Sequence, residues 1–132
     1  MSSVELKKLV QKIFKECVEN MKATEPLYAQ YFSKEYIQHV DGKTLNYADF
    51  VAHMKAQKQA LKSIKIVFHE MIAEGNKVAT SHTAYATRKD NKKIEAQIVS
   101  LFEFKDGKLV LCTELTRLEK GEESDRDIGS RH

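Results

Sequence analysis

The sequence predicts an α+β fold in which a curved antiparallel sheet wraps around three N-terminal helices and encloses a pocket. Apolar residues recur every three or four positions through most of the first half of the chain, which is typical of amphipathic helices. From residue 64 onward they alternate along four long runs, which is typical of strands. The connections between these runs are short, so neighbouring strands are antiparallel, and strands this long coil the sheet. The helices can then pack across its concave face.

Three helices are expected before the long strands. Ser2 and Glu5 form a capping-box pair at the start of the first helix, whose apolar stripe continues to Met21. Pro26 fits the first turn of a second, shorter helix, because the N–H that proline lacks would be unsatisfied there. Asn46 caps the third helix.

The strands are bounded by turn residues. Tyr36–Val40 alternates as a short strand before the third helix, and Asp41-Gly42-Lys43 forms a turn after it. Asp106-Gly107, between two alternating runs, is a strong signal for a two-residue hairpin. The four long strands are predicted at Ile64–Ala73, Lys77–Arg88, Lys93–Lys105 and Lys108–Leu118.

Length and composition indicate one domain at residues 1–118, followed by a polar tail at residues 119–132 that is either free or docked on a partner subunit. The net charge of +3, from 22 basic and 19 acidic residues, gives no indication of nucleic-acid or membrane binding. The two cysteines, Cys17 and Cys112, lie far apart, which is typical of a reducing compartment. There is no signal-peptide pattern and no apolar run of membrane-spanning length, so we expect a cytoplasmic protein.

The order helix, helix, short strand, helix and curved sheet resembles the nuclear transport factor two-like superfamily. Within it, the chain is similar to the SnoaL-like polyketide cyclase and ketosteroid isomerase branch. The residues that carry the resemblance are Tyr36–His39, Gly42, Phe50 and Phe102–Leu109. The resemblance implies a cone-shaped, cystatin-like α+β barrel with a deep cavity for a small apolar ligand and no cofactor. It also implies a homodimer formed through the outer face of the sheet.

Three residues are candidates for catalysis. His39 could act as a base, because an imidazole with a pKa of about 6.5 accepts a proton near neutral pH, and the resemblance places it near the catalytic carboxylate of the isomerases. The alternative is a histidine hydrogen-bonded at a strand end. The resemblance also places Ser100 near the oxyanion hole and Glu114 near the last-strand acid of the cyclases. A Glu114 on the inner face would have a raised pKa, whereas on the outer face it would pair with a basic residue.

Six further residues are expected to line the pocket: Tyr28, Tyr36, Asp41, Phe102, Cys112 and Thr116. Core packing is the alternative for both tyrosines, and a turn-forming role is favoured for Asp41, which could otherwise orient His39. His39 and Asp41 have no third ligand at a suitable spacing, so no metal site is expected. His82 is interpreted as a structural or interface residue, and the other two mid-chain histidines, His53 and His69, as structural.

The sequence therefore predicts a cofactor-free pocket protein. One hypothesis is a proton-transfer enzyme (an isomerase, cyclase or hydratase) that acts on a small apolar carbonyl compound with His39 as base. Steroid isomerisation is disfavoured, because Phe14 and Cys17 stand where the isomerases carry a tyrosine. The alternatives are a non-catalytic ligand-binding domain and a dimeric interaction module whose cavity is filled by its own side chains.

Overall fold

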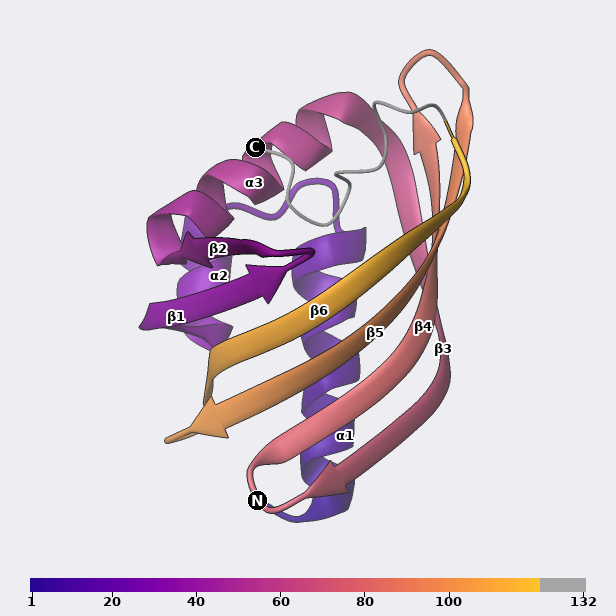
Figure 1. Cartoon of the computed structure of the whole chain (residues 1–132). Coiled ribbons are helices and arrows are strands. Elements are labelled where there is room, and N and C mark those ends of the chain that lie inside the picture. The colour runs from indigo at the N-terminus through magenta and orange to yellow at the C-terminus, as the bar shows by residue number, and fades with distance from the viewer. Residues whose placement is uncertain (122–132) are drawn as a thin grey trace.

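A six-stranded sheet curves around the helices, as the sequence predicts, in a computed structural model that describes residues 1–121 (Figure 1). The strand order is β2-β1-β6-β5-β4-β3. Helix α1 crosses the concave face of the long strands, and α3 covers one end of it. The elements are α1 (Ser3–Ile13), the π-helix η1 (Phe14–Glu19), α2 (Glu25–Tyr31), β1 (Phe32–Val40), β2 (Lys43–Asn46), α3 (Tyr47–Ala60), β3 (Leu61–Glu74), β4 (Lys77–Arg88), β5 (Lys93–Lys105) and β6 (Lys108–Lys120).

The helix starts follow the capping signals. Ser2 and Glu5 form the expected capping box, with the Glu5 N–H donating to the Ser2 hydroxyl at 3.1 Å. Asn46 and Asp49 form a second one at the start of α3. The first helix differs from the prediction, because its α-helical part ends at Ile13 and the chain continues as the π-helix η1. Such wide turns are frequent near functional sites.

The hairpin between β1 and β2 was only partly predicted. Strand β1 begins at Phe32, four residues earlier than expected, and β2 was not expected at all. Asp41 and Gly42 both have positive φ angles, of 52° and 82°, which is the conformation that a two-residue hairpin requires. Strand β1 then pairs with β6 in parallel, the one exception to the predicted antiparallel pairing in the described sheet.

The long strands form the predicted meander. Strands β4 and β5 have the predicted bounds, whereas β3 starts three residues earlier and extends to Glu74. Strand β6 continues through Glu119 and Lys120, the first two residues of the predicted tail. Gly121 follows the strand as a bend, and the rest of that prediction, residues 122–132, lies outside the described residues. Asp106 and Gly107 form the expected hairpin, with positive φ angles of 52° and 80°.

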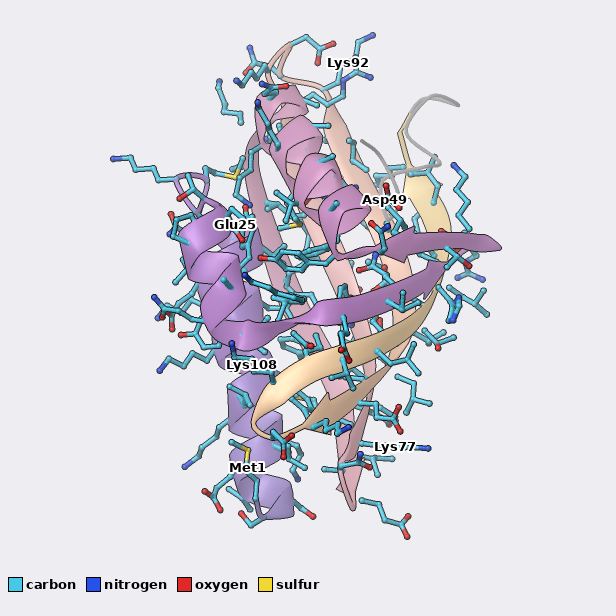
Figure 2. The ribbon with its side chains drawn as sticks, turned by 90° about the vertical axis from the view of Figure 1, so that its left-hand side faces the viewer. Met1, Glu25, Asp49, Lys77, Lys92 and Lys108 are labelled. Carbon is cyan, nitrogen blue, oxygen red and sulfur yellow. The ribbon has the colours of Figure 1, made fainter. Side chains whose placement is uncertain are left out.

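The core lies between the concave face of the sheet and the helices. Phe32 and Tyr36 from β1 pack against Phe50 of α3, with ring centroids 4.4 Å apart for the two phenylalanines. In the view of Figure 2, α1, α2 and α3 lie along one side of the sheet, and the labelled lysines Lys77 and Lys92 lie at opposite ends of the molecule. Within residues 1–121, no helix combines the length and the apolar character needed to cross a membrane.

Candidate functional site

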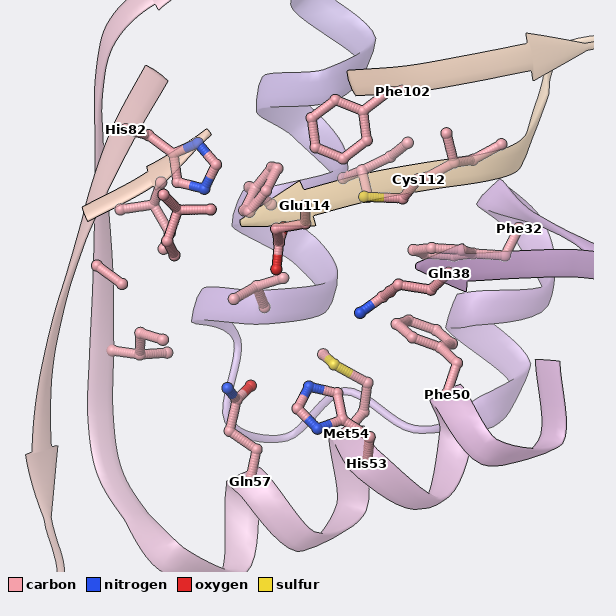
Figure 3. A pocket seen from close by; sticks show the side chains of 18 of the residues that line it. Phe32, Gln38, Phe50, His53, Met54, Gln57, His82, Phe102, Cys112 and Glu114 are labelled. Carbon is pink, nitrogen blue, oxygen red and sulfur yellow. The ribbon is translucent and has the colours of Figure 1, made fainter. Parts of the chain in front are cut away.

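A cavity of about 90 Å³ lies inside the curve of the sheet, closed by η1 and α3 (Figure 3). Ligand pockets for drug-sized molecules have volumes of roughly 300 to 1,000 Å³, so this cavity suits a much smaller compound. Its walls are mainly apolar, with contributions from Phe14, Phe32, Phe50 and Phe102. Five polar side chains interrupt the apolar wall: Gln38, His53, Gln57, His82 and Glu114.

The most unusual of these polar groups is Glu114 on β6. Its carboxylate accepts a hydrogen bond of 2.8 Å from the hydroxyl of Ser100 on β5. Burial raises the pKa of Glu114 to about 7; the Asp41 charge adds to this rise, and the Ser100 hydrogen bond opposes it. The carboxyl group can therefore gain or lose a proton near neutral pH, which is what a general acid or base needs.

A β-bulge places Glu114 and Ser100 side by side. The hairpin pairs Phe104 with Leu109, but the register shifts by one residue before Glu103 pairs with Leu111. This shift brings Ser100 opposite Glu114 and turns both side chains inward. Without the bulge, strand alternation would turn Glu114 to the outer face. The inner-face interpretation of Glu114 therefore agrees with the structure.

Tyr36 and Cys112 line the cavity beside Glu114, as expected, and Phe102 does so on β5. The Tyr36 hydroxyl donates to the Gln38 side-chain oxygen at 2.6 Å, and the Gln38 amide nitrogen points into the cavity (Figure 3). Burial raises the pKa values of Tyr36 and Cys112 well above their ordinary ranges. Both groups are therefore neutral at the pH where Glu114 titrates.

His39 does not reach the cavity, so its predicted position is wrong. Its side chain is exposed, and its Nδ1 lies 3.0 Å from the Thr44 hydroxyl of β2. The neighbouring residues Gln38 and Val40 are buried, and alternation along β1 therefore turns His39 outward. The interpretation of a histidine hydrogen-bonded near the end of its strand fits this geometry.

Three expected lining residues also lie elsewhere. Tyr28 is buried in the helical core, where its hydroxyl donates to the Ala23 carbonyl at 3.2 Å. Asp41 occupies the exposed turn, as its turn-forming interpretation requires, and its carboxylate accepts the Thr116 backbone N–H at 2.7 Å. Thr116 lies on β6 beyond the residues that line the cavity. Sequence periodicity identified the inner face of β6 but not how far along it the cavity extends.

Ser100 is close to the cavity but does not suit the role that the resemblance implied. An oxyanion hole needs a hydrogen-bond donor aimed at the substrate, whereas the Ser100 hydroxyl donates to Glu114. The Ser100 hydroxyl is therefore directed at the Glu114 carboxylate.

Four polar lining residues were missed by the sequence interpretation: Gln38, His53, Gln57 and His82. On α3, His53 and Gln57 are buried together with Phe50 and Met54, and their spacing of three and four residues places all four on one helix face. This spacing could have identified His53 and Gln57 from the sequence.

On β1, Gln38 lies on the same inward-facing side of the strand as Tyr36. His82 was interpreted as a structural or interface residue. In the structure it lies on the concave face of the sheet and is fully buried in the cavity wall.

Comparison with known proteins agrees with this architecture. Residues 16–112 match the family model of the SnoaL-like domain. An uncharacterized protein of Schizosaccharomyces pombe is 35% identical over 100 residues, which covers 76% of this chain and 77% of the relative.

Many solved structures are similar in fold, and two of them illustrate the likeness. AclR of Streptomyces galilaeus superposes with a TM-score of 0.77 at 18% identity, covering 99% of this chain and 89% of its own. An LEH-like epoxide hydrolase of M. tuberculosis superposes with a TM-score of 0.70 at 12% identity, covering 87% of this chain and 84% of its own. At these identities the likeness establishes the fold alone.

Proposed function

The chain belongs to the SnoaL-like domain family of the nuclear transport factor two-like superfamily, and we propose that it is a cofactor-free proton-transfer enzyme with Glu114 as its acid and base. The single observation that supports this most is the Glu114 carboxyl, which lies in an apolar cavity with its pKa raised to about 7. The Glu114 carboxylate accepts a hydrogen bond from the neutral Ser100 hydroxyl, and its pKa is raised mainly by burial.

The cavity limits the substrate class. Its small volume and phenyl side chains favour a compact, mainly apolar molecule. A carboxylate can remove a proton from carbon only where the resulting negative charge is stabilised, and an adjacent carbonyl group does this. The proposed substrate is therefore a small ketone or aldehyde, and the reaction is isomerisation or ring closure through an enolate. Epoxide hydrolysis, the activity in the name of one structural neighbour, would use the same carboxylate to activate water.

The direct test is exchange of substrate hydrogens for deuterium in heavy water. A panel of small ketones, from acetone to cyclohexanone, would be followed by ¹H NMR with and without the protein. We expect protein-dependent loss of the signals next to the carbonyl, at a rate that rises with pH through a midpoint near 7, because the ionised Glu114 is the active form. Binding of these ketones without exchange would contradict the proposal and favour a non-catalytic binding domain.

The outer face of the sheet supports a proposal about assembly. Ile72, Val99, Leu101 and Leu115 are 43% to 66% exposed there and lie around one shallow groove. Exposed apolar patches on a sheet commonly mark protein interfaces. We propose that two copies of the chain pair through this face.

The Leu115→Lys variant is expected to shift the protein from dimer to monomer, because it would place two charges in the apolar contact. Sedimentation equilibrium measures the mass directly. Val4→Lys is the matched control, since Val4 is 56% exposed on α1, away from the outer face of the sheet. A wild-type protein that sediments as a monomer at high concentration would contradict this assembly.

A further inference from the structure

His82 lines the cavity and has a buried polar atom without a hydrogen-bond partner among residues 1–121. Its side chain is fully buried on the concave face of β4, and its Nδ1 lies 3.0 Å from the Thr80 hydroxyl. Its Nε2 is buried and has no hydrogen-bond partner within residues 1–121. Buried polar atoms are almost always paired. An unpaired nitrogen in a cavity wall therefore indicates a partner that enters the cavity from outside.

The aromatic neighbours of His82 carry no nitrogen or oxygen atom that could be that partner. The Phe14 and Phe68 rings pack against the imidazole, with centroids 5.1 and 5.3 Å from its own. Burial lowers the pKa of His82 to about 4, with a smaller contribution from the charge of the nearby His69, so the ring is neutral near pH 7. A neutral imidazole carries one proton, on either Nδ1 or Nε2.

The direction of the hydrogen bond between Thr80 and His82 decides which nitrogen carries the proton. Its hydroxyl is buried and needs an acceptor for its own hydrogen, and its hydrogen-bond partner is the His82 Nδ1. When the hydroxyl donates to Nδ1, that nitrogen must be the unprotonated one, and the proton lies on Nε2. The cavity wall then holds an N–H donor on the inner face of β4, while the Glu114 carboxylate comes from β6.

We propose that the His82 Nε2–H donates a hydrogen bond to the carbonyl oxygen of the substrate while Glu114 acts on the neighbouring carbon. This inference rests on the proposed function and supplies the oxyanion donor that Ser100 does not. His82 is thereby assigned as a residue that selects carbonyl compounds and stabilises their enolates.

The step balances without any further reactant. The Glu114 carboxylate takes a proton from the carbon next to the carbonyl, so a C–H bond breaks and an O–H bond forms. The electron pair of the C–H bond forms the C=C bond of an enolate, and the negative charge moves to the oxygen that His82 holds. The imidazole keeps its proton throughout. The protonated Glu114 side chain then returns the proton to the same or another carbon, which restores the carbonyl of the substrate and the carboxylate of Glu114.

Two readouts test this assignment. The first needs no turnover: ¹⁵N NMR of labelled protein is expected to show a neutral His82 protonated on Nε2. Added cyclopentanone is then expected to shift that N–H signal. The second is the deuterium-exchange rate of the His82→Phe variant, which keeps a flat ring but cannot donate. Loss of one oxyanion donor lowers such rates by about 10²- to 10³-fold, and the pH midpoint near 7 that belongs to Glu114 is expected to remain.

Two further variants make the result specific. Thr80→Val removes the hydroxyl at nearly constant shape, so we expect a larger fraction of the ring to be protonated on Nδ1 and an intermediate loss of rate. His39→Phe is the matched control, because that imidazole is exposed on the other face of β1. The Thr80 variant and the tautomer measurement keep the test decisive if His82→Phe does not fold.

The outcomes separate this inference from the proposed function. A wild-type ring protonated on Nδ1, or an unchanged exchange rate in folded His82→Phe, would overturn the role of His82 and leave Glu114 as the base. No exchange by the wild type, combined with a cyclopentanone-induced shift at Nε2–H, would overturn the enzymatic proposal and retain His82 as a carbonyl-binding residue.

Discussion

The Glu114→Gln variant is expected to exchange ketone hydrogens about 10² to 10⁴ times more slowly than the wild type, the contribution typical of a general base. Glutamine has nearly the same shape as glutamate and can still accept the Ser100 hydrogen bond, but its amide oxygen cannot take a proton from carbon. The cavity and the donor groups around it would be retained. The loss therefore isolates proton transfer from binding.

The control for this variant is Glu35→Gln, which makes the same chemical change at an exposed position on β1. Its exchange rate is expected to equal that of the wild type. The two variants are compared by ¹H NMR in heavy water with the same ketone at saturating and subsaturating concentrations. Equal rates for Glu114→Gln and the wild type would contradict the assignment of Glu114 as the base.

The same substitution is expected to change how stability depends on pH. Because the pKa of Glu114 is raised from 4.5 in the unfolded chain to about 7 in the fold, the folded state binds its proton more tightly. This contribution is fully present below pH 4.5 and is lost as the pH rises to 7 and above. The shift corresponds to at most about 3 kcal/mol, and to less because the residue is partly exposed. Glu114→Gln has no such loss, so its stability relative to the wild type rises by that amount between pH 4.5 and 8.

His82 gives a second pH dependence of opposite sign. Its pKa falls from 6.5 to about 4 on folding, so its contribution is present above pH 6.5 and is lost as the pH falls toward 4. In the wild type the two groups oppose each other between pH 4.5 and 6.5, and stability changes little there. In Glu114→Gln only the His82 effect remains, so the variant loses stability on acidification.

Urea denaturation at several pH values from 4.5 to 8 measures both effects. Glu35→Gln again serves as the matched control, because its carboxylate is exposed. A constant difference between Glu114→Gln and the wild type across this range would show that the Glu114 pKa is not raised by the fold.

Local sequence signals predicted the scaffold well. The bounds of β4 and β5 followed from alternation and turn residues, and the hairpin at Asp106-Gly107 followed from its turn chemistry. The parallel pairing of β1 with β6 had no such signal, because it joins segments that are far apart in the chain. The β-bulge in β6, which brings Ser100 opposite Glu114, also had no local sequence signal.

The candidate site was predicted less completely, and for a different reason. His39 was chosen for its chemistry, whereas the alternation of Tyr36, Gln38 and Val40 already indicated that it faces outward. His82 was not predicted to line the cavity, because small neighbours on one face of a strand leave room for either a ligand or a partner sheet. The direction in which the sheet curves determines which face encloses the cavity, and curvature is a property of the whole sheet.

The central claim is that a glutamate inside the curve of the sheet titrates near neutral pH. The most direct measurement is a ¹³C NMR titration of the Glu114 side-chain carboxyl, assigned by comparison with Glu114→Gln. We predict a midpoint near pH 7. A midpoint close to the ordinary value of 4.5 would show an unperturbed carboxylate and would contradict the proposed acid–base role.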